Sequence, residues 1–232
     1  FHARVWDAEQ LEEGVIRFNY TSADGEEGFP GTLTLDVKYT LTTDSVEICY
    51  NAVSDKDTVM NFTNHSYFNL NGTDAGDIKD HIAQIFADKY TPVSPVLIPT
   101  GEIASVKGTP FDFTSPKRIG EDIDSGKLPG GYDHNYVLGE TKEMRKAAEI
   151  YSDKTGRVMT TYTDMPAIQF YISGGLGGET GKGGKEMFKN QGFCLESQFC
   201  PDSPNKPQFK PTCVYKAGEQ YNFTTIYKFS VK

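Results

Sequence analysis

The sequence lacks several features that would place it in a broad class. Its 232 residues contain no apolar run near the roughly 18 residues of a membrane-spanning helix. Positive charge is scarce, since 23 Lys and Arg face 32 Asp and Glu, which gives a formal net charge of −9. An excess of negative charge repels a phosphate backbone. We therefore expect neither a membrane nor a nucleic acid as a partner.

Metal-binding and targeting patterns are also missing. The four cysteines form no C-x-x-C pair and the four histidines lie far apart in the sequence, so we expect no metal and no cofactor. No signal-peptide pattern follows Phe1, and we expect a cytoplasmic location. We expect reduced, mostly buried thiols. A disulfide between two of the last three stays open because they are close in the sequence: Cys194, Cys200 and Cys213.

Two common catalytic motifs are absent. There is no G-x-S-x-G nucleophile elbow. Gly178 and Gly183 have the spacing of the glycines in a phosphate loop, but Gly184 stands where that loop needs a lysine. These observations argue against a serine hydrolase of that type and against a nucleotide-binding loop.

Strand patterns dominate what is present. Tyr, Phe and Gly are abundant, and apolar residues alternate with polar ones over 33–41 and again over 46–52, which predicts an antiparallel hairpin. Further strands are predicted at 15–21, 82–87, 147–151, 158–163, 168–172, 193–198 and 226–231. No long helix separates them. The sequence therefore predicts an all-β protein, a large antiparallel β-sandwich that forms a single domain over 1–232.

Three polar clusters interrupt these apolar patterns, at 63–70, 131–136 and 192–198. Alternate residues of a strand share a face, which would group His65 with Tyr67 and Asn69, and Glu196 with Cys194 and Gln198. Each cluster taken alone fits a structural role. Together they offer an imidazole, the carboxylates of Asp133 and Glu196, and aromatic walls. Such a set is suited to proton transfer on a polyhydroxylated ligand.

The clusters carry a resemblance to a known family. The chain resembles aldose 1-epimerases, also called galactose mutarotases, through Asn-His-Ser-Tyr-Phe-Asn-Leu at 64–70, Gly-Tyr-Asp-His-Asn at 131–135 and Cys-Leu-Glu-Ser-Gln at 194–198. The non-catalytic segments 24–31 and 225–231 match as well. Several matches in one order along the chain make chance a poor explanation.

The resemblance implies a large antiparallel sandwich and the interconversion of α and β anomers of free hexoses such as galactose and glucose. It implies that His65 is the general acid toward the ring oxygen and Glu196 the general base on the anomeric hydroxyl. It further implies that Asp133 and Gln169 hold sugar hydroxyls, and we expect Tyr67 to pack on the apolar face of the sugar. The expected partner is a monosaccharide, and the expected assembly is a monomer or a homodimer.

The sequence departs from the family pattern in two places. The family's Asn-Arg-Ile and Leu-His-Gly-Gly segments have no counterpart, and His2 does not match the histidine of the second. We therefore expect a chain that lacks the N-terminal part of the family. The segment 171–176 also differs, which points to altered sugar preference or to loop drift.

Three other functions stay open from the sequence. A non-catalytic relative would bind sugar without speeding anomer exchange. A hexose-phosphate epimerase would need a basic cluster at the cleft, for which the candidates are Lys182, Lys185 and Lys189. A glycosidase would use Asp133 and Glu196 at a separation typical of hydrolases.

Overall fold

The computed structural model describes residues 1–232, apart from the side chain of Lys182. Three antiparallel sheets make up the fold. The largest has nine strands, in the order β1 (Asp7–Glu12), β2 (Val15–Ser22), β3 (Leu33–Leu41), β4 (Ser45–Ser54), β16 (Tyr221–Val231), β12 (Arg157–Thr163), β11 (Arg145–Tyr151), β6 (Ile82–Ile85) and β9 (Lys117–Arg118).

A second sheet of five strands and a third of two complete the β-structure. The five are β14 (Phe193–Gln198), β13 (Ala167–Ile172), β10 (Asp133–Val137), β7 (Lys89–Thr91) and β8 (Ala104–Ser105), and the pair is β15 (Val214–Tyr215) with β5 (Thr58–Val59). Helices are short: α1 (Glu121–Asp124) and the 3-10 turns Glu26–Gly28, Lys182–Gly184 and Ser203–Asn205. No helix in the described part of the chain is long and apolar enough to cross a membrane.

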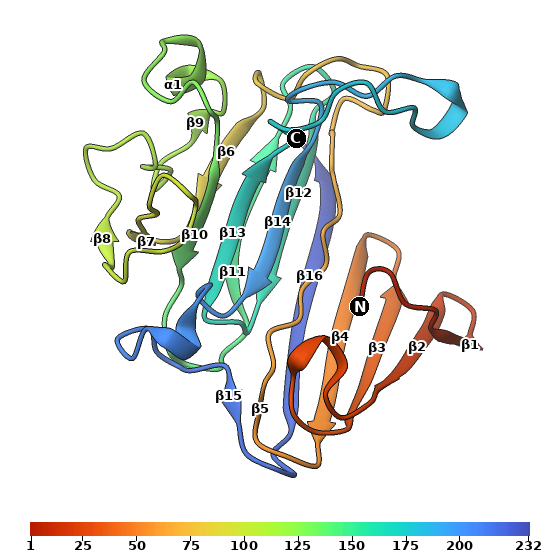
Figure 1. Cartoon of the computed structure of the whole chain (residues 1–232). Coiled ribbons are helices and arrows are strands. Elements are labelled where there is room, and N and C mark those ends of the chain that lie inside the picture. Colours follow the sequence, from red (N-terminus) through yellow and green to blue (C-terminus); the bar gives the residue numbers. More distant parts are fainter.

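The two larger sheets share one hydrophobic core. Phe170 and Leu195 of the five-stranded sheet lie in the same buried cluster as Ile150 and Met159 of the nine-stranded sheet. The Tyr227 hydroxyl donates a 2.6 Å hydrogen bond to the carbonyl of Leu195 and so links the sheets. Figure 1 shows β10, β13 and β14 over β11, β12 and β16, while β1 to β4 extend to one side. The predicted sandwich is confirmed.

Period-2 sequence patterns explain most strands. In β3 the apolar residues Leu33, Leu35 and Val37 are buried, and they alternate with exposed or half-buried polar ones. The strands predicted at 33–41 and 193–198 have the predicted ends, and the others shift by a few residues. Two longer strands, β1 and β10, were not predicted. Their sequences DAEQLE and DHNYV lack a clean apolar alternation.

The cysteines behave as predicted. All four are free thiols, three of them buried and Cys49 half-buried. The alternative of a disulfide among the last three is therefore not realised in the structure.

Candidate active site

The outer face of the five-stranded sheet is polar because its strands alternate. In β14, Phe193 and Leu195 point into the core, which sends Cys194, Glu196 and Gln198 to the opposite face. Strand register places Glu196 beside Gln169 of β13, and Gln169 beside Asn135 of β10. The predicted grouping of Cys194, Glu196 and Gln198 is confirmed, and three neighbouring strands contribute to one polar surface.

Glu196 is the buried carboxylate of this surface. Only 8% of the residue is exposed. Burial, which penalises the charged form, is the main cause that raises the pKa of Glu196 to about 6. His65 acts in the opposite direction, while the charge of Asp133 raises the pKa further. The carboxylate therefore stays mostly ionised at pH 7, yet it is a stronger base than an exposed glutamate.

His65 reaches Glu196 from an irregular segment rather than from a strand. The segment runs along the free edge of β14 and is held at two points: Asn61 exchanges hydrogen bonds with the backbone of Phe199, at 2.9 and 3.2 Å, and Phe68 pairs with Phe193, at 2.8 and 3.0 Å. Between these anchors His65 places Nε2 3.6 Å from Oε1 of Glu196. Its side chain is 51% exposed, so the imidazole is open to solvent.

The histidine cluster does not form a strand. Because residues 61–67 are irregular, strand alternation does not set the faces of His65, Tyr67 and Asn69. Asn69 lines the same hollow as Tyr67. The amide of Asn69 donates to the carbonyls of Gly76, at 3.0 Å, and Gln191, at 2.9 Å, and so fixes the loop.

Two tyrosines flank the imidazole. The ring of Tyr67 lies 4.9 Å from that of His65 and the ring of Tyr171 lies 5.7 Å from it, centroid to centroid. Tyr67 is 46% exposed and also lines a hollow of about 540 Å³ beside the site. Tyr171 lies across from Cys194 in the strand register. The sequence singled out Tyr171 only as a departure from the family pattern, whereas the structure places it at the site.

A row of amides orients the remaining polar groups. The amide of Gln198 donates to Gln169 Oε1 and to Asn135 Oδ1, each at 3.0 Å. Gln169 in turn donates to Asp133 Oδ1 at 2.7 Å. Since the Gln198 bonds require the carbonyl oxygen of Gln169 to point toward it, they also set the direction of the amide nitrogen that holds Asp133. Sequence reasoning missed Asn135 and this role of Gln198, because the row appears only once three strands are in register.

Metal ligands were not predicted, yet one group of potential ligands occurs here. Among the side chains that the structure describes, His65, Cys194 and Glu196 form the one set of three whose donor atoms lie within 4.8 Å of one another. The prediction that the protein needs no metal stays a prediction.

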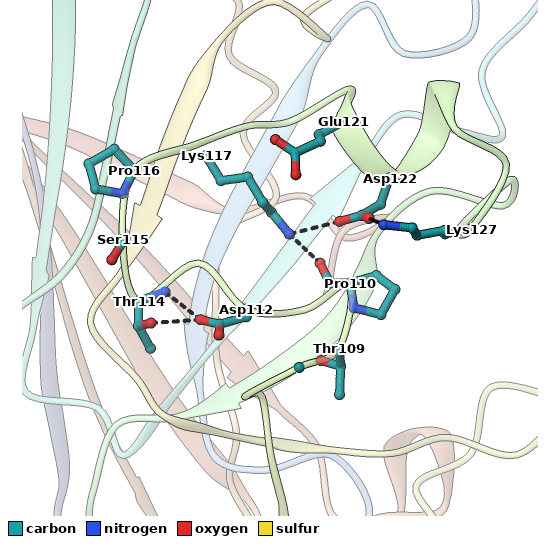
Figure 2. A pocket seen from close by; sticks show the side chains of 11 residues that line it. Thr109, Pro110, Asp112, Thr114, Ser115, Pro116, Lys117, Glu121, Asp122 and Lys127 are labelled. Carbon is teal, nitrogen blue, oxygen red and sulfur yellow. Dashed lines mark hydrogen bonds and ion pairs between the residues drawn. The ribbon is translucent and has the colours of Figure 1, made fainter.

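Another hollow lies elsewhere on the molecule. It measures about 580 Å³ and lies between the loop around Pro110 and α1 (Figure 2). Inside it, Lys117 donates to Asp122 at 2.9 Å and to the carbonyl of Pro110 at 2.6 Å. None of the predicted site residues line it. We therefore place the site on the sheet face.

Fold and site together define a β-sandwich protein with a carboxylate–imidazole pair on an open, polar sheet face. Comparison with known proteins identifies the family. The family described as aldose 1-epimerase matches residues 1–228. The chain belongs to the aldose 1-epimerase family.

Individual relatives agree with this assignment. The galactose mutarotase of Rattus norvegicus is 44% identical over 232 residues, which is 100% of this chain and 67% of the relative. The aldose 1-epimerase of Escherichia coli K12 is 40% identical over 235 residues, covering 99% of this chain and 68% of the relative. An aldose epimerase homologue from C. elegans has a solved structure that covers 98% of this chain and 69% of its own, with 29% identity and a TM-score of 0.88.

Proposed function

We propose that this chain interconverts the α and β anomers of free hexoses, with His65 as general acid and Glu196 as general base. The observation that carries the proposal is the 3.6 Å approach of His65 Nε2 to a buried Glu196 carboxylate on an open face. The two reacting oxygens of a pyranose, the ring oxygen and the anomeric hydroxyl, are both bonded to the anomeric carbon. An acid and a base a few ångströms apart can therefore serve both.

The reaction then needs no group beyond these two. Glu196 takes the proton of the anomeric hydroxyl, the bond from the anomeric carbon to the ring oxygen breaks, and His65 protonates that oxygen. The open aldehyde rotates about its first carbon–carbon bond, and the reverse transfers close the other anomer. Each transfer is worth roughly 10²–10⁴-fold in rate. The proximity of His65 lowers the pKa of Glu196 and so favours the ionised carboxylate that a base requires.

Substrate binding is assigned to the polar row and the aromatic wall. Asp133 and Gln169 offer a carboxylate and an amide to sugar hydroxyls, oriented by Gln198. Tyr67 offers an exposed ring beside His65 for the apolar face of the sugar. Oligomeric state, monomer or homodimer, and a cytoplasmic location stay predictions.

The charges near the site favour a neutral sugar over a hexose phosphate. Asp133 and Glu196 make the surface negative, and a phosphate would need lysines to offset them. Of the three candidates, Lys185 pairs with Asp74 at 3.3 Å and Lys189 is exposed. The third, Lys182, has its side chain outside the described part of the structure.

Polarimetry on freshly dissolved α-galactose and α-glucose tests the proposal. The chain should speed the drift to equilibrium, while His65→Asn and Glu196→Gln should each lose at least about 10²-fold of the catalysed rate. His2→Asn is the matched control, because His2 is exposed and is not one of the proposed site residues. A folded but inert chain that still binds galactose would instead favour the non-catalytic, sugar-binding alternative.

A further inference from the structure

Cys194 is a site residue that the proposed reaction does not use. It precedes Glu196 by two positions on β14, so both side chains lie on the polar face. Its thiol lies 3.5 Å from Nδ1 of His65, and no part of the residue is open to water. A buried thiol beside an imidazole and a carboxylate is a set of soft and borderline donors.

We propose that His65, Cys194 and Glu196 form an inhibitory site for Zn²⁺ or a similarly soft divalent cation. The three donor atoms lie within 4.8 Å of one another. A tetrahedral zinc with bonds of about 2.3 Å to sulfur and 2.0–2.1 Å to nitrogen places those two donors about 3.5 Å apart. The distance from His65 Nδ1 to Cys194 Sγ is 3.5 Å. The carboxylate lies close enough to complete a three-ligand set.

Charge and accessibility favour the same occupant. Asp133 lies near Glu196, and a cation between the donors would offset the negative charge of these two carboxylates. The side chain of His65 is half-exposed, so one of the three ligands is open to solvent. On binding, the thiol S–H bond breaks, a sulfur–zinc bond forms and the proton passes to solvent. Mg²⁺ and Ca²⁺ prefer all-oxygen ligands and are not expected to compete.

Occupation of this site would stop catalysis without unfolding the protein. The metal would hold both the proposed acid and the proposed base, and its fourth position would stay open to water. The inhibition rests on the proposed function, whereas the binding does not. The two are therefore measured separately.

Binding is tested with Co²⁺ as a spectroscopic stand-in for Zn²⁺ on the metal-free chain. A thiolate-to-cobalt charge-transfer band should appear, Zn²⁺ should remove it, and Mg²⁺ should not. Cys194→Ser should lose the band and weaken Zn²⁺ binding by at least about tenfold. Loss of a residue that merely supports a metal ligand costs about 10–100-fold in affinity, and loss of a ligand should cost no less. Cys49→Ser is the control, because Cys49 is the least buried cysteine and lies outside the site. It should keep the band.

Inhibition is tested by polarimetry with increasing Zn²⁺, each variant being compared with its own metal-free rate. Zn²⁺ should inhibit the unchanged chain in competition with galactose. Cys194→Ser should need a Zn²⁺ concentration at least about tenfold higher for the same degree of inhibition. Absence of a thiolate band in the unchanged chain, or equal Zn²⁺ binding by the folded Cys194→Ser chain, would overturn the proposal. A chain that binds Co²⁺ through Cys194 but has no activity to inhibit would overturn the proposed function alone.

Discussion

Replacing Glu196 with Gln should stabilise the fold at neutral pH even though it removes the proposed base. The carboxyl has an ordinary pKa of 4.5, and burial on the sheet face raises the pKa to about 6. Between these values the unfolded chain has lost the proton and the folded chain keeps it. The free energy of unfolding of the unchanged chain therefore falls as the pH rises through this window, and the loss persists above it.

The size of the effect follows from the two pKa values. Their difference corresponds to about 2 kcal/mol. The amide of E196Q does not ionise, so the variant avoids this loss. Any packing effect of the amide is common to both ends of the pH range. The relevant quantity is therefore how much the stability difference between E196Q and the unchanged chain grows with pH.

Urea unfolding at about pH 4 and about pH 8 measures that quantity. The advantage of E196Q should be about 2 kcal/mol greater at the higher pH. Glu149→Gln is the control of opposite sign: a hydrogen bond from Lys146 lowers the pKa of Glu149, so this variant should lose relative stability as the pH rises. An E196Q advantage that is equal at both pH values would refute the reasoning, and so would one that is greater at pH 4.

Three further predictions concern the reaction and the framework of the site. The acidic limb of kcat/KM should have its midpoint near pH 6, because Glu196 must be ionised to act as the base. Asp133→Asn should move that midpoint to lower pH, because it removes a charge that raises the pKa of Glu196. A pH–rate profile of each chain checks both expectations, and a midpoint near pH 4.5 in the unchanged chain would contradict the assignment. Gln198→Leu should raise KM for galactose by about tenfold with a smaller effect on kcat, since loss of one buried hydrogen-bond partner costs about 1–3 kcal/mol. Steady-state kinetics measure both constants. An unchanged KM would show that Gln198 does not orient the groups that bind the sugar. Phe193→Ala should lower the free energy of unfolding in urea by about 3–5 kcal/mol, because the ring is fully buried and packs against Phe68, which anchors the irregular segment that carries His65. A loss below about 1 kcal/mol would show that this contact does not hold the segment.

Sequence patterns predicted the strands with regular apolar alternation but missed a strand that forms through pairing with its neighbours. β14 was predicted with its observed ends because Phe193 and Leu195 alternate with more polar residues, and this alternation also placed Glu196 on the correct face. β10 was missed because Asp133, His134 and Asn135 lie within it, and these residues are unusual in strands. Its conformation comes from pairing with β7 and β13, which a local pattern does not contain.

The sequence supplied candidate residues for the site but not their geometry. The resemblance to the family pointed to His65, Glu196, Asp133 and Gln169, and the aromatic residues beside them added Tyr67. The structure brings these five side chains to one surface. The resemblance gave no sign that His65 lies on an irregular segment along the edge of β14. The long-range pairing of Asn61 with Phe199 determines that path, and the two residues are 138 positions apart. The roles of Asn135 and Gln198 depend on strand register for the same reason.

The most direct test of the central claim is anomer exchange of galactose at equilibrium, measured by NMR magnetisation transfer between the α and β anomeric protons. At equilibrium the signal reports only the interconversion of the two anomers. The account predicts catalysed exchange with the unchanged chain, and a loss of at least about 10²-fold in His65→Asn and in Glu196→Gln. Both variants should still bind galactose through Asp133 and Gln169. Exchange that continues at the full rate in either folded variant would contradict the assignment of acid and base.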